Sequence, residues 1–106
     1  MYARVTQLEI DTVRIDVDDA LAIFVDMVLP RLRAQPGYEG ASVLTTAEGK
    51  GMVLSLWDTA EHAAADAEKG FYADVLSQFV TLFKAPPGRE RYEVRLIDTT
   101  SGSRLM

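Results

Sequence analysis

Residues 40–66, GASVLTTAEGKGMVLSLWDTAEHAAAD, contain the pattern that decides the fold. Two runs rich in β-branched and apolar residues, 40–46 and 51–57, flank a short loop that contains a glycine, which predicts a β-hairpin. The only tryptophan of the chain, Trp57, ends the second run. Asp58 is the predicted N-cap of a helix, because Asp58-Thr59-Ala60-Glu61 has the form of a capping box. The alanines that follow Asp58 predict a helix with small side chains, which can pack closely against a neighbouring element.

A strand and a helix are predicted before this hairpin. Residues 2–10 alternate as a strand does, although polar residues occur on both of its faces. Asp16, Asp18 and Asp19 suit the start of a helix, as N-cap acceptor and as negative charge at the positive end of the helix dipole. Pro30 is expected to kink the last turns, and residues 35–37 end the helix. The predicted buried stripe of this helix consists of Leu21, Phe24, Val25, Val28, Leu29 and Leu32.

A further helix and a strand are predicted after residue 66. Gly70 interrupts the alanine-rich helix, and a third helix follows. Its apolar face consists of Phe71, Val75, Phe79, Leu82 and Phe83. Residues 85–88 end this helix, and residues 90–98 alternate as a fourth strand. The polar residues 99–106 are expected to form a flexible tail, so residues 1–98 are predicted to be one domain.

The order of these elements predicts the fold class. Two similar strand–helix–strand halves are typical of the α+β, ferredoxin-like split βαβ fold, a four-stranded antiparallel sheet with helices on one face. The other face of such a sheet is open. We expect Val43, Val53 and the apolar side of the fourth strand to lie on that open face, where a second copy would cover them in a homodimer.

Composition excludes several classes of partner. The chain has 106 residues, of which 11 are Lys or Arg and 16 are Asp or Glu, so its formal charge is −5. Nucleic acids and anionic membranes are bound by dense basic residues, so neither is an expected partner. The chain has no cysteine, no signal-peptide pattern and no apolar run long enough to cross a bilayer. These features predict a cytoplasmic protein.

Two motifs give the chain a resemblance to a known family. Pro36-Gly37-Tyr38-Glu39-Gly40 precedes the second strand, and Leu54-Ser55-Leu56-Trp57-Asp58-Thr59 with Glu61 and Ala64 spans the junction between the third strand and the next helix. With the spacing of the elements over residues 2–98, these motifs resemble the antibiotic biosynthesis monooxygenase superfamily, whose members are dimeric α+β barrels. The resemblance implies oxidation of a small aromatic, phenolic or quinone-like metabolite without a cofactor, in a cleft between sheet and helices.

The resemblance also implies site residues. In such oxygenases the substrate is deprotonated and its carbanion passes an electron to dioxygen, which needs an apolar slot and polar groups to orient the substrate. The expected catalytic residues are Tyr72, Trp57 and Thr6, and the expected substrate-binding residues are Arg4, Phe24, His62 and Phe79. The asparagine that these oxygenases also use has no clear counterpart.

The haem-degrading branch of the superfamily does not fit this sequence. Its asparagine, tryptophan and iron-ligating histidine would fall near Thr6, Asp66 and residues 75–76, and none of the three matches. A lone histidine without a second histidine or a cysteine is not a metal site, and Asp16-Val17-Asp18-Asp19 lacks the glycine and distal glutamate of a calcium loop. We therefore expect no metal and no cofactor.

The same residues also have structural interpretations. Trp57 can be a packing residue at the corner between strand and helix, and His62 can be a solvent-exposed residue of the first helical turn. Two further hypotheses stay open. The protein is a non-catalytic dimeric binding protein for a small molecule, or its own side chains fill the cleft and the dimer serves assembly alone.

Overall fold

The structure is a computed structural model that describes residues 1–64 and 88–105. Its main sheet consists of β1 (Tyr2–Glu9), β2 (Tyr38–Thr45), β3 (Lys50–Trp57) and β4 (Gly88–Glu93). Between β1 and β2 lie α1 (Val17–Ile23), the π-helix η1 (Phe24–Val28) and α2 (Leu29–Arg33), and β3 leads into α3 (Ala60–Ala64). β5 (Leu96–Thr99) and β6 (Gly102–Leu105) form a separate hairpin at the C-terminal end.

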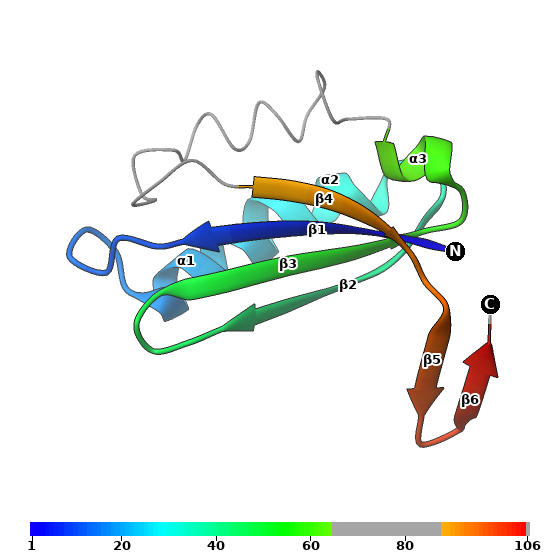
Figure 1. The fold of residues 1–106 in the computed structure, drawn as a ribbon. Coiled ribbons are helices and arrows are strands. Elements are labelled where there is room, and N and C mark those ends of the chain that lie inside the picture. Colours follow the sequence, from blue (N-terminus) through cyan, green and yellow to red (C-terminus); the bar gives the residue numbers. More distant parts are fainter. Residues whose placement is uncertain (65–87, 106) are drawn as a thin grey trace.

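The sheet has the order β2-β3-β1-β4, and all neighbouring strands are antiparallel. The described helices lie on one side of this sheet (Figure 1). This order places the first and last strands of the sheet side by side, which is the ferredoxin-like arrangement. The predicted fold class is therefore confirmed.

The hairpin predicted over residues 40–57 is confirmed as β2 and β3. In its turn, the backbone N–H of Thr46 donates to the carbonyl of Lys50, and the carbonyl of Thr46 accepts from the N–H of Gly49. Gly49 has φ of 101°, which only glycine adopts without strain, and its carbonyl accepts a 2.7 Å hydrogen bond from Ile10 N–H. This contact fastens the end of β1 to the tip of the hairpin.

The helical segment after β1 changes its winding before Pro30. Leu29 N–H bonds to the carbonyl of Phe24, five residues back, so one π-helical turn separates α1 from α2. Proline has no N–H to donate, and its ring clashes with the carbonyl four residues earlier in a regular α-helix. The wider π turn accommodates the proline without that hydrogen bond and without the clash. The irregularity predicted at Pro30 is therefore a π-helical turn.

The predicted buried stripe of this segment is only half right. Val28 and Leu32 are buried at 5% and 0% exposure, with Phe24 and Leu29 packed beside them, whereas Leu21 and Val25 are exposed. The inserted π turn rotates the residues before it relative to those after it, so one helical face does not continue across the segment. Val28 and Leu32 form the core cluster together with Trp57 and Ala63.

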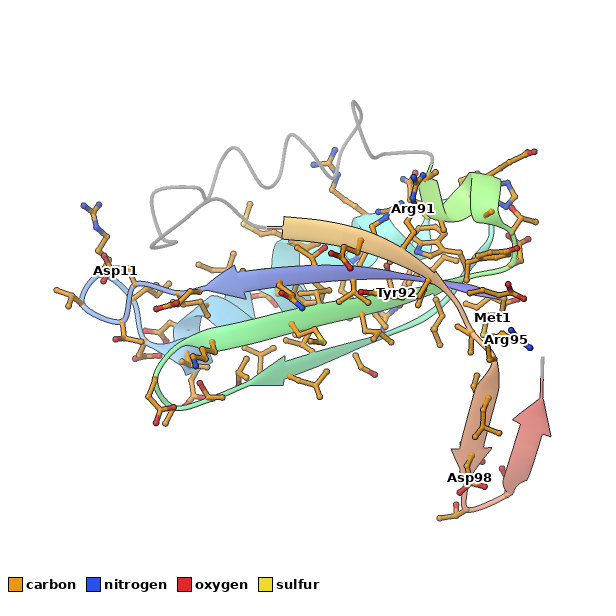
Figure 2. The ribbon with its side chains drawn as sticks, in the orientation of Figure 1. Met1, Asp11, Arg91, Tyr92, Arg95 and Asp98 are labelled. Carbon is orange, nitrogen blue, oxygen red and sulfur yellow. The ribbon has the colours of Figure 1, made fainter. Side chains whose placement is uncertain are left out.

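The open face of the sheet carries a different set of residues from the predicted one. Val53 is 7% exposed, and register places Val43 opposite it, on the face that also carries Arg4 and Trp57. The expectation that Val43 and Val53 face away from the helices is therefore wrong. The open face instead presents the alternate positions of each strand. Its apolar members are Ala3, Val5, Leu44, Met52, Leu54, Leu56 and Tyr92, and the polar residues Gln7, Ser42 and Glu90 lie among them. Figure 2 shows Arg91 and Tyr92 on opposite sides of β4.

The C-terminal end also differs from the prediction. The predicted strand over 90–98 is divided into β4 and β5, and the predicted tail supplies β6, which pairs with β5. Val94 N–H bonds to the carbonyl of Met1, the residue before β1, so the pairing of β4 with β1 extends by one hydrogen bond beyond both strands. The third helix predicted after Gly70 lies outside the described residues. That residues 1–98 form one domain stays a prediction.

Among the residues that the structure describes, no helix is long and apolar enough to cross a membrane.

Replacing Leu32 by alanine tests the core. We expect Leu32→Ala to lower the free energy of unfolding by about 2–5 kcal/mol, because this side chain is fully buried and its removal leaves a cavity. Leu21→Ala, at a position that is 40% exposed, should change it by less than about 1 kcal/mol. Urea unfolding followed by Trp57 fluorescence measures both; equal losses would contradict the described core.

Candidate functional site

Trp57 lies at the end of β3, where the sheet meets α3. Its ring is 1% exposed and meets the ring of Tyr38 edge to face, with centroids 5.8 Å apart. Its indole N–H donates to Ser55 Oγ at 2.9 Å, and the Ser55 hydroxyl in turn donates to the backbone carbonyl of Arg4 at 3.5 Å. The indole is therefore held by packing and by hydrogen bonds at once.

Arg4 points from the central strand β1 toward the helices. It is 3% exposed, and its Nε donates to the carbonyl of Ala63 in α3 at 2.8 Å. Its Cζ lies 4.9 Å from the centroid of the Trp57 ring, which is a cation–π distance. A positive charge thus lies inside the layer between sheet and helix, where an apolar residue would be the ordinary choice.

Thr6 and Phe24 lie on the same side of the sheet as Arg4. Thr6 follows Arg4 by two residues in β1 and is 1% exposed, so its side chain faces the helices as well. Phe24 is partly buried and packs against the core cluster that includes Trp57. The structure therefore brings Arg4, Trp57 and Phe24 to one corner, with Thr6 next along the strand.

His62 lies in α3, directly before the buried Ala63. Its Nδ1 is 2.6 Å from Asp58 Oδ1, and the two side chains are 39% and 43% exposed. The side chain that caps the helix is that of Thr59, whose hydroxyl accepts from His62 N–H at 3.1 Å. The prediction of Asp58 as the N-cap is therefore wrong by one residue; its carboxylate binds the histidine ring instead.

The hydrogen bond from His62 holds the pKa of the Asp58 carboxyl below its ordinary value. The backbone of Asp58 is fixed too, because its N–H donates to the carbonyl of Gly37 at 3.0 Å. Gly37 has φ of 79°, and a Cβ there would collide with Asp58 Oδ1 and with the His62 ring. Only glycine satisfies both constraints, so the turn before β2 is shaped around this pair.

Tyr72 and Phe79, the remaining predicted site residues, lie outside the described residues. Asp16, which was considered for calcium, caps α1 and accepts from Asp19 N–H at 2.8 Å, as the capping interpretation predicts. Within residues 1–64 and 88–105, no three His, Cys, Asp or Glu side chains are grouped so that they could hold a metal ion.

The sequence reasoning missed the contribution of Ser55 and of the Ala63 carbonyl. The sequence could have predicted Ser55 as a partner of Trp57. It is a hydroxyl residue in an apolar strand, two positions before Trp57 and hence on the same face. A backbone carbonyl gives no sequence signal.

A separate hollow of about 390 Å³ lies at the far end of the sheet, lined by residues that include Thr12, Asp16, Asp18 and Thr46.

Comparison with known proteins supports the fold. The sequence matches no family model, and it has no significant match among curated proteins. A crystal structure of a protein of unknown function from Nitrosomonas europaea is similar over 95% of both chains, with a TM-score of 0.72 and 22% identity. A candidate antibiotic biosynthesis monooxygenase from the same organism has a TM-score of 0.69 and 17% identity over 88% of both chains.

A third similar structure contains a ligand. It is a monooxygenase of Streptomyces coelicolor in complex with nanaomycin D, with a TM-score of 0.69 and 16% identity, covering 89% of this chain and 87% of that one. At these identities the likeness establishes the fold alone. The resemblance to the antibiotic biosynthesis monooxygenases is thus confirmed as a likeness of fold.

Gly37→Ala tests the turn beneath the Asp58–His62 pair. We expect it to cost at least about 1 kcal/mol of unfolding free energy, because alanine at positive φ is strained and its Cβ displaces the pair. Gly40→Ala is the matched control, since its Cβ would lie 3.9 Å from the nearest atom, in Leu56. We expect a change within about 0.5 kcal/mol for this control. Equal effects in chemical unfolding would refute the proposed constraint.

The lowered pKa of Asp58 predicts a pH dependence of stability. A carboxyl with a depressed folded-state pKa contributes stability above its unfolded pKa, and this contribution is lost as the pH falls through the folded value. We expect wild type to be more stable than Asp58→Asn at pH 5, and the difference to shrink once the pH falls below the ordinary value of 3.8. Urea unfolding of both proteins at pH 5 and at pH 2.5 measures it; a difference independent of pH would contradict the interaction.

Proposed function

We propose that the protein is a monooxygenase of the antibiotic biosynthesis type, which oxidises a small phenolic or quinone-like aromatic molecule between sheet and helices. The observation that carries the proposal is the buried polar corner formed by Arg4, Ser55 and Trp57. Burying a guanidinium is costly, and a corner that served packing alone would be more stable with apolar residues. Retaining the charge there is consistent with a role in binding.

The charge of this corner fits a substrate that becomes an anion. Arg91 of β4 is the register partner of Arg4 and lies on the same face, so two guanidinium groups occupy adjacent strands. The chain as a whole carries a formal charge of −5, so this local positive charge is not a general property of the protein. A phenolate would be stabilised by such an arrangement.

The proposed reaction requires the substrate and dioxygen alone. Deprotonation of an anthrone-type CH₂ group gives a carbanion, which transfers one electron to O₂, and recombination of the radical pair forms a carbon hydroperoxide. Loss of water then leaves a carbonyl, so one oxygen atom enters the product and the other leaves as water. We assign substrate orientation to Arg4, Thr6 and His62 and the aromatic walls to Trp57, Phe24 and Phe79, and Tyr72 remains the proposed hydrogen-bond donor.

The alternative is a dimeric protein of the same fold that binds a small aromatic molecule without turning it over. Its specific support is that the indole N–H of Trp57 and Nε of Arg4 both bond within the protein. A group with an internal partner can still shape a pocket, although it contributes less to chemistry. The two functions therefore differ in turnover and share the binding corner.

We propose further that the open face of the sheet is covered by a second copy of the chain. Leu44 and Tyr92 are 55% and 50% exposed there, beside the half-buried Met52, Leu54 and Leu56. A sheet face that exposes several large apolar side chains is typical of an interface, and a two-fold contact can bury the same face of both copies. The resemblance to dimeric α+β barrels supports the same partner.

Fluorescence of Trp57 and oxygen uptake together test the function. Because Trp57 is the only tryptophan, its quenching by hydroxyquinones or anthrone-type phenols reports binding at this corner. We expect saturable quenching with oxygen consumption, and a loss of about tenfold or more in kcat/KM for Thr6→Val, which keeps the volume and removes the hydroxyl. Thr100→Val, at an exposed turn, is the matched control. Quenching without oxygen uptake would favour the binding protein, and no quenching by any of these compounds would refute both.

The dimer is tested by placing a charge on the open face. We expect light scattering to show a dimer for wild type and a monomer for Leu44→Glu, since an unpaired carboxylate at a buried interface is costly. Val13→Glu, at a position that is 93% exposed in a loop, should leave the dimer intact. A wild-type monomer at micromolar concentration would contradict the proposed dimer.

A further inference from the structure

The Asp58–His62 pair has an arrangement that the expected role of His62 in substrate binding does not explain. The two side chains meet through a single short contact of 2.6 Å between Nδ1 and Oδ1. Both remain accessible, with about two-fifths of each side chain exposed to solvent. The pair therefore has a defined geometry and an open route to a ligand.

The position of the proton follows from the carboxylate. The pKa of Asp58 lies below its ordinary value, so at neutral pH the group is ionised and can only accept a hydrogen bond. Nδ1 of His62 must then carry the proton of the contact. In the neutral ring this leaves the lone pair on Nε2, which becomes the basic atom of the side chain.

The surrounding backbone holds this arrangement in place. Thr59 caps the turn that carries His62, and Gly37 lies so close that no side chain fits between the loop and the pair. The N–H of Asp58 bonds to the carbonyl of Gly37, which fixes the backbone that carries the carboxylate. The position of the pair is thus set by contacts from two segments of the chain, the loop at Gly37 and residues 58–59.

The same helical turn leads to the buried corner. The residue after His62, Ala63, is fully buried, and its carbonyl accepts from Arg4 Nε. A helix as short as α3 therefore presents the histidine at the surface and the acceptor of Arg4 inside. The basic nitrogen and the buried cation belong to one structural unit.

We propose that His62 is the general base of this protein, that it accepts the proton of a substrate hydroxyl or of the adjacent acidic C–H at Nε2, and that Asp58 positions it. The inference rests on the proposed function and adds its proton-transfer step. The substrate proton moves to Nε2 and leaves the electron pair on the substrate as a phenolate or enolate. Asp58 stabilises the resulting imidazolium.

The first test concerns the tautomer and needs no substrate. His62 is the only histidine, so the ¹⁵N spectrum of the ring contains a single pair of nitrogens. We expect the neutral ring to be protonated at Nδ1 in wild type and to shift toward the Nε2-protonated form in Asp58→Asn, which removes the carboxylate charge. Glu61→Gln, an exposed change on the same helix, should leave the wild-type tautomer. Protonation at Nε2 in the wild type would overturn the proposal.

The second test concerns the reaction. With an anthrone-type substrate, we expect His62→Ala to lower kcat by about 100-fold or more while the substrate still quenches Trp57. Added imidazole should restore part of that rate, because the exposed ring leaves an accessible space; a purely structural role would not be rescued. Full activity of His62→Ala, or activity that imidazole does not restore, would overturn the assignment.

These outcomes separate the two proposals. If wild type consumes no oxygen with any substrate of the panel, the proposed function fails whatever tautomer the ring has. If wild type consumes oxygen and His62→Ala does so equally fast, the function stands and only the base is wrong. Far-UV circular dichroism and Trp57 emission of each variant establish that it is folded.

Discussion

The buried guanidinium of Arg4 is the constraint on which the contacts between β1, β3 and α3 depend. A charge inside the layer between sheet and helix must be compensated, and here one partner is the Ala63 carbonyl and another is the face of Trp57. These contacts place α3 over β1 and fix the tryptophan at the end of β3. Trp57 in turn engages Ser55, whose hydroxyl returns to the backbone of Arg4. The corner is therefore a closed set of contacts among three elements.

This arrangement couples fold and function, because the residues proposed to bind the substrate also hold α3 against the sheet. The core cluster is small, with Val28, Leu32, Trp57 and Ala63 as its buried members. Arg4 and Thr6 lie beside that cluster, so a ligand that reached them would approach the residues that hold α3 to the sheet. Binding and local stability are then linked, and ligands that bind the folded protein would raise its resistance to unfolding.

The sequence predicted the sheet well and the helices less well. Strand alternation and the glycine-containing turn located β1, β2 and β3 to within a few residues, because each signal is local. The stripe over 21–32 failed in part, since the π turn before Pro30 changes the helical period and leaves Leu21 and Val25 exposed. The open face was misassigned although the alternation of β3 alone places Val53 on the same face as Ser55 and Trp57. Which of the two faces the helices cover is decided by tertiary packing.

The candidate site was predicted only where a side chain itself carried the signal. Arg4, Trp57 and Phe24 stand out as residue types, and the structure places them at one corner. The Asp58–His62 contact depends on the cap beginning one residue later than the capping-box pattern indicates, and the role of Gly37 depends on a turn distant in sequence. Such features arise from tertiary contacts, which the local sequence pattern does not predict.

Labelled dioxygen tests the central claim, that this corner supports oxidation by O₂, most directly. The purified protein would be incubated with an anthrone-type phenol under ¹⁸O₂, and the product analysed by mass spectrometry. We predict that one ¹⁸O atom enters each molecule of product and that Thr6→Val slows its formation. A product without ¹⁸O, or incorporation no faster than in protein-free buffer, would contradict the account.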